Sequence, residues 1–131
     1  MAECTVKSPT NKHYTKIASL MAALSLWIAL DKGSMGTMNE ATNAPATEAS
    51  ETGLTRAAAT VSSQTTTVTG DTMRATKTFT AGTTATITGF HVMSAASGGD
   101  DYGWGKFNSP QPLEQNDQLI CTANFQYKKG T

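Results

Sequence analysis

The feature that most constrains this chain is a series of short apolar and Thr-rich segments, separated by turns, that runs from Leu54 to Lys128. Such a series is typical of an antiparallel sandwich or barrel, and β-branched threonine, which fills 23 of 131 positions, suits the pleated surface of a strand. The predicted fold class is therefore mainly β, an antiparallel β-sandwich. We expect strands over 54–61, 65–69, 72–80, 84–93, 102–107 and 118–128, with turns at 69–71, 81–82 and 97–100.

The chain before these strands divides into a polar arm over 1–16 and an uncharged apolar segment over 17–30. Apolar residues first follow helical spacing and then alternate, which predicts a helix over 12–23 and a strand over 25–30, with one continuous helix as the alternative. This segment of 14 residues falls short of the roughly 20 that cross a bilayer, so we predict no membrane span. Residues 17–131 are expected to form a single domain.

Two polar stretches are expected to be loops. The first covers 31–53, has no periodicity, and is long enough that either its own domain or a neighbouring subunit must hold it. The second precedes the last strand and contains Pro110 and Pro112, whose missing N–H donors cost nothing in a loop.

Charge and cysteine content exclude several classes of function. Ten Lys and Arg balance ten Asp and Glu, so no electrostatic field gathers phosphates, and nucleic acid is not expected as a partner. Cys4 and Cys121 are too few for a zinc site. They could form a bridge; otherwise Cys121 is a buried thiol in a strand and Cys4 a free thiol in the arm. No cofactor is predicted.

Reactive side chains are few. His91 lies near Ser94 and Asp101 in the sequence, but there is no nucleophile elbow, and a satisfied or surface histidine explains it better than catalysis. Carboxylates near 100–101 and 114–117 could bind calcium, yet they lack EF-hand spacing and are better explained as turn-forming residues. We predict no catalytic residue and no metal site, and the protein is expected not to be an enzyme.

Four residues are candidates for an interface: Trp27, Arg56, Tyr102 and Trp104. The segment DYGWGKF places Tyr102 and Trp104 on one strand face, where they are core residues, interface anchors or a platform for sugar rings. Trp27 could likewise be a core residue, an interface anchor or part of a platform for sugar rings. Arg56 belongs to a solvated face or to a salt bridge between subunits.

Three stretches resemble a family of small tailed-bacteriophage virion proteins: the strand Leu26-Trp27-Ile28-Ala29-Leu30 with the loop after it, Gly53-Leu54-Thr55-Arg56-Ala57-Ala58, and residues 87–99 with Gly-Phe and Ala-Ala-Ser-Gly-Gly. Asp100-Asp101 and the longer N-terminal arm depart from the family pattern. The resemblance implies a jelly-roll-like β-sandwich behind a short N-terminal helix, repeated many times on a phage particle.

The function predicted from these observations is that of a non-enzymatic structural component of the virion, made in the host cytoplasm, that decorates or cements the capsid. The alternative is a tail or fibre component that binds a receptor or glycan. Partners would be the major capsid protein or tail proteins, with self-association as a trimer or binding to a preformed lattice through 1–16 and 31–53.

Overall fold

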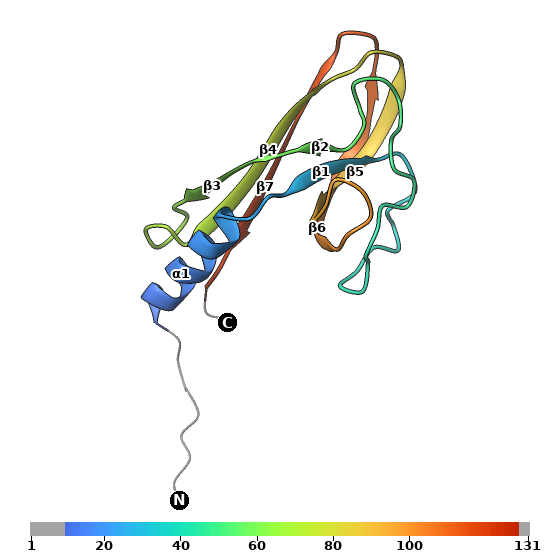
Figure 1. The fold of residues 1–131 in the computed structure, drawn as a ribbon. Helices are drawn as coiled ribbons and strands as arrows, with labels where there is room; N and C mark the ends of the chain where they lie inside the picture. The colour runs from blue at the N-terminus through green and yellow to red at the C-terminus, as the bar shows by residue number, and fades with distance from the viewer. Residues whose placement is uncertain (1–9, 129–131) are drawn as a thin grey trace, which may run out of the picture. The chain divides into compact units, whose positions relative to one another are not determined.

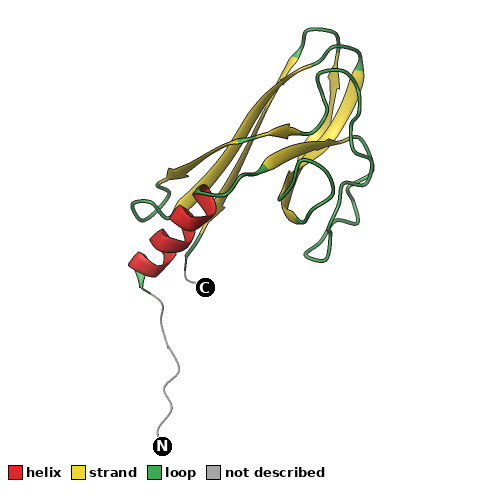
Figure 2. Ribbon diagram, viewed as in Figure 1, coloured by secondary structure: helices red, strands yellow, loops and turns green. Residues whose placement is uncertain are grey.

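The computed structural model describes residues 10–128, which form one helix and seven strands joined by loops (Figures 1 and 2). In chain order the elements are α1 (Asn11–Ala22), β1 (Trp27–Asp31), β2 (Ala57–Ala58), β3 (Thr60–Gln64), β4 (Thr72–Thr80), β5 (Ala85–Met93), β6 (Asp101–Leu113) and β7 (Gln118–Gln126).

The strands form two antiparallel sheets, one with the order β2-β1-β5-β6 and the other with the order β3-β4-β7. In the first sheet β1 is central, and four of its five residues are buried, which explains its continuous apolar sequence. Strand β6 pairs with β5 and lies at the edge.

The described chain divides into two compact units, which are considered separately. The larger covers 25–60 and 75–123 and holds most of the strand residues. Its core draws on both sheets: Ile28 and Ile87 come from one, Phe79 and Cys121 from the other. The prediction of a mainly β sandwich is confirmed, whereas the jelly-roll order stays a prediction.

The smaller unit covers 10–24, 61–74 and 124–128 of the described chain. Its loop before β4 is organised by the buried Asp71, whose carboxylate accepts the backbone N–H groups of Thr66, Thr67 and Val68 at 2.9–3.1 Å. The expected strand over 65–69 is wrong, because these N–H groups bond to one carboxylate instead of to a neighbouring strand. That 17–131 form a single domain stays a prediction.

The N-terminal pattern of a helix followed by a strand is confirmed, and the single continuous helix is wrong. The helix begins at Asn11 and so includes residues 11–16, while 1–9 lie outside the described residues; that 1–16 form an arm stays a prediction. No helix in the described part of the chain is long and apolar enough to span a membrane.

Two other expectations about strands are corrected. The strand expected over 54–61 is interrupted, since β2 pairs with β1 while β3 belongs to the other sheet. Pro110 and Pro112 lie within β6 and not in a loop. An edge strand tolerates proline because one of its sides needs no N–H donor.

Two of the expected turns contain glycines in a conformation that other residues rarely adopt. Gly70 lies in the turn at 69–71, Gly98 and Gly99 lie in the turn at 97–100, and all three have positive φ. The chain also bends at 82–83, between β4 and β5.

Candidate functional site

A buried charge cluster lies between β1, β5 and β6 of the larger unit. His91 is fully buried, and its Nε2 lies 2.8 Å from an Asp31 carboxylate oxygen while its Nδ1 lies 2.5 Å from one of Asp101. With a proton on each nitrogen, the ring donates to both carboxylates. The histidine is therefore a satisfied one, as the sequence indicated.

Asp31 also fixes the start and end of the long loop after β1, drawn in teal in Figure 1. Its carboxylate accepts the backbone N–H groups of Gly33 and Ala46 at 2.8 Å and of Thr47 at 3.0 Å. The loop over 31–53 is thus held by its own unit, one of the two expected possibilities.

The pKa values of the cluster follow from these contacts. Burial alone would lower the pKa of His91, but its hydrogen bonds to Asp101 and Asp31 and their charges outweigh burial and raise it. Burial would raise the pKa of Asp31, yet the N–H donors and the His91 ring lower it overall. Both shifts favour an imidazolium between carboxylates.

The imagined Ser-His-Asp arrangement does not form. The Ser94 hydroxyl accepts the backbone N–H of Asp100 at 2.8 Å, and both nitrogens of His91 are occupied by carboxylates. A general base needs a nitrogen that can reach a nucleophile, and this ring offers none.

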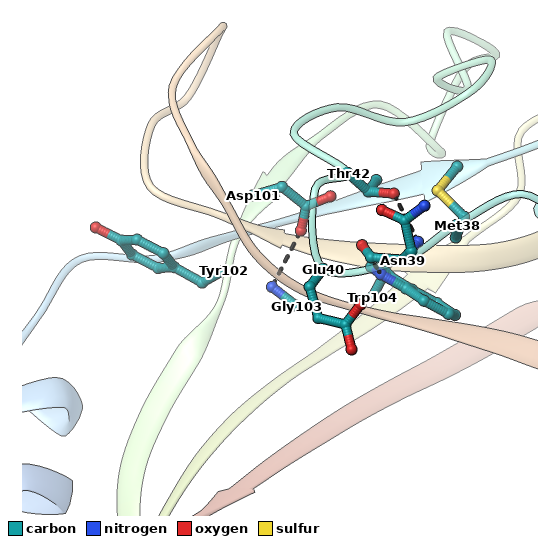
Figure 3. A pocket seen from close by; sticks show the side chains of 8 residues that line it. All are labelled: Met38, Asn39, Glu40, Thr42, Asp101, Tyr102, Gly103 and Trp104. Carbon is teal, nitrogen blue, oxygen red and sulfur yellow. Dashed lines mark hydrogen bonds between the residues drawn. The ribbon is translucent and has the colours of Figure 1, made fainter.

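Beside this cluster the surface is hollowed, with a cavity volume of about 420 Å³ (Figure 3). One wall is the loop segment Met38, Asn39, Glu40 and Thr42, and the other is the β6 segment Asp101, Tyr102, Gly103 and Trp104. The loop is tied to β6, because the Trp104 indole N–H donates to the Asn39 carbonyl at 3.4 Å and Asn43 accepts the Asp101 N–H at 3.2 Å.

Tyr102 and Trp104 are 44% and 40% exposed, so the interpretation of both as core residues is wrong. Their strand face points outward, while the opposite face carries Phe107, which packs against the core, and Gly105. A Cβ at Gly105 would lie 3.1 Å from the ring of Phe90, so this glycine leaves space for that ring. Figure 3 shows the Trp104 ring against the loop and the Tyr102 ring pointing away from it.

Arg56 is not a solvated residue. Its guanidinium bonds to both carboxylate oxygens of Glu48 at 2.6 and 3.0 Å and to the carbonyls of Ala95 and Gly98 at 3.0 and 2.7 Å. These contacts hold two loops of the larger unit together. Trp27 is half-buried in β1 opposite Ala58 and Met93. Whether any of the four candidates lies in an interface stays a prediction.

Two of the acidic residues considered for calcium accept backbone N–H groups. Asp117 accepts the Glu114 N–H at 2.8 Å, and Asp101 accepts the Gly103 N–H at 3.0 Å. Among residues 10–128 no group of three or more His, Cys, Asp and Glu side chains is placed to hold a metal ion.

Cys121 is a buried free thiol, as one alternative predicted, and burial raises its pKa to about 12. Cys4, its possible bridging partner, lies outside the described residues.

Sequence reasoning missed Asp31. A local signal was present, since Asp-Lys-Gly directly after an apolar strand is typical of a turn in which the aspartate accepts an N–H two residues on. The contacts with Ala46, Thr47 and His91 left no such signal.

Fold and site together describe a small β-sandwich protein whose buried charges hold its loops and whose aromatic side chains face outward. A family model described as podophage GP4 fiber I protein gp80 matches residues 10–125. The match covers most of the chain, which therefore belongs to this family of phage fibre proteins. No curated protein and no solved structure matches the chain.

Proposed function

We propose that the protein is a non-enzymatic structural component of a fibre on a tailed-phage particle, assembled with other virion proteins. The family match is the observation that carries this proposal, because its description names a fibre protein of a podophage. Decoration of the capsid, the function first expected from the sequence, is the competing location.

The geometry supports a structural role. The long loop is fixed by Asp31, and the loop before β4 by Asp71, through several N–H groups each. Surfaces fixed in this way lose little conformational entropy when they meet a neighbour, so contacts repeated over a particle can be individually small.

Side chains suited to such contacts are also present. Tyr102 and Trp104 project from β6, and Ile120 on β7 is 65% exposed. Aromatic residues in particular are enriched at protein interfaces. We infer that the protein self-associates as a trimer through the β7 face that carries Ile120, or binds a preformed assembly through the β6 face that carries Tyr102 and Trp104, with Trp27 as a further contact. Arg56 contributes indirectly, because its guanidinium is already bonded within the chain.

Immunogold labelling of intact particles tests the location. An antibody to this chain is applied to purified virions of the encoding phage, and gold is counted over heads, tails and fibres, with pre-adsorbed antibody as the control. Gold concentrated on fibres supports the proposal. Gold spread over the heads would assign the protein to the capsid surface, and unlabelled particles would remove it from the virion.

Self-association is tested on the purified chain by sedimentation over a range of concentrations. A trimer, or a monomer that binds particles lacking this protein, is expected. A chain that stays monomeric at every concentration and does not bind such particles would contradict a structural role.

A further inference from the structure

We propose that the hollow between the loop segment 38–42 and β6 binds one hexopyranose unit of a saccharide without negative charge, with the Trp104 ring as the stacking surface. The hollow contains Trp104, Glu40 and Thr42 on its walls (Figure 3). This inference concerns binding by the isolated chain and goes beyond the proposed place in the virion.

The size and openness to solvent suit a single ring. A volume of about 420 Å³ lies within the range of roughly 300–1,000 Å³ that is typical of small-molecule sites. Trp104 is 40% exposed, so part of its ring is available to an incoming ligand. A pyranose presents a face of C–H groups to such a ring, and burying that face against the indole removes apolar surface of both from water.

The polar groups of the hollow set the charge of the ligand. Glu40 lines the hollow with an exposed side chain, whereas the Asp101 carboxylate is buried against His91 and offers no free acceptor to a ligand. A carboxylate accepts hydrogen bonds and donates none, which fits the vicinal hydroxyl groups of a sugar. The negative charge of the carboxylate repels phosphate, sulfate and uronate groups. The occupant is thus rich in hydroxyl groups and carries no negative charge.

The loop wall is organised before any ligand arrives. The Thr42 hydroxyl accepts the Asn39 N–H at 2.9 Å, and the Asn39 side chain accepts the Ala41 N–H at 2.8 Å. Together with the bond between the Trp104 indole and the Asn39 carbonyl, these contacts fix the loop backbone on both sides of Glu40 relative to β6. A preformed site binds more tightly because less conformational entropy is lost.

The test is a titration of the isotope-labelled full chain with glucose, galactose, mannose, rhamnose and N-acetylglucosamine, followed by NMR at the indole N–H signals of Trp104 and Trp27. At least one sugar should shift the Trp104 signal in a saturable way and leave that of Trp27 in place. Replacement Trp104→Ala, followed at the Gly103 amide, should weaken binding roughly tenfold, and Trp104→Phe by less. Glu40→Gln, a change on an exposed loop, should weaken binding of the same sugar.

Glu114→Gln is the matched control for Glu40→Gln, since it removes the same charge from an exposed position of the same unit outside the hollow and should leave affinity unchanged. The proposal is overturned if none of the sugars shifts the Trp104 signal at tens of millimolar. It is also overturned if Trp104→Ala leaves the affinity unchanged, if Glu40→Gln and Glu114→Gln have equal effects, or if tetramethylammonium binds the hollow and the sugars do not. None of these outcomes depends on where the protein lies in the virion.

Discussion

Asp31→Asn is the substitution that most directly tests how the larger unit is held together. The side chain keeps its shape, but one of its two oxygens becomes an NH₂ group. In the folded protein one oxygen accepts the N–H groups of Gly33 and Thr47, and the other accepts the Ala46 N–H and the His91 ring.

The expected loss in the free energy of unfolding depends on which of these hydrogen bonds the asparagine amide can keep. With its carbonyl facing Gly33 and Thr47, the substituted side chain places its NH₂ against the Ala46 N–H, which loses its acceptor at a cost of about 1–3 kcal/mol. The NH₂ also faces Nε2 of His91, which keeps this contact only by giving up its proton and accepting from the amide. The two remaining backbone bonds weaken by roughly 0.5 kcal/mol or more each, because their acceptor is no longer charged. The opposite orientation would leave two N–H groups without an acceptor. We expect a loss of about 3 kcal/mol in the free energy of unfolding.

Urea unfolding followed by tryptophan fluorescence measures this loss. Trp27 and Trp104 are the two tryptophans of the chain, and both lie in the larger unit, so the signal reports on the unit that contains Asp31. Asp100→Asn is the matched control, because it removes the same charge from an exposed position and should change stability by less than about 0.5 kcal/mol.

The reasoning would be refuted if Asp31→Asn and Asp100→Asn unfolded at the same urea concentration. That result would mean that the carboxylate bonds to the loop contribute nothing net to stability. A large loss in both variants would also contradict it, since overall charge and not the buried cluster would then be responsible.

Three further outcomes are expected. The pKa of His91 is raised above its ordinary 6.5, so the stability that its two ion pairs contribute is complete below about pH 6.5 and falls as the pH rises through the folded-state pKa. Urea unfolding of the wild-type chain at pH 6 and pH 9 measures this difference. Equal unfolding midpoints at the two pH values would contradict it. Gly53→Ala should lower the free energy of unfolding by more than about 1 kcal/mol, because Gly53 has φ +82° and a Cβ there would collide with the Thr80 carbonyl. Gly98→Ala should cost less in the same urea assay, because Gly98 has φ +60° but open space around it. In a variant whose other cysteine is replaced by serine, Cys121 should not react with a thiol reagent at pH 8 until urea unfolds the chain. Rapid modification of the native protein would show that the thiol is not buried.

Much of the local structure could be predicted from the sequence. The alternation of Cys121, Ala123 and Phe125 with the polar residues between and after them marked β7, and the change from helical to alternating spacing marked the boundary between α1 and β1. These predictions succeeded because a period of 3.6 or 2 is set by the geometry of each element and is visible within a few residues.

The sequence by itself determined most of the strands and which residues of a strand share a face, but only the tertiary structure decided where strands are interrupted or extended, which face is buried and which distant residues meet. Tyr102 and Trp104 are outside because the opposite face of β6, which carries Phe107, packs against the core. Asp31 and His91 are 60 residues apart and meet because β1 and β5 pair. An alternating pattern is unchanged when a strand is turned over, and strand pairing between distant segments is fixed by the packing of the whole core, which no local window of sequence contains.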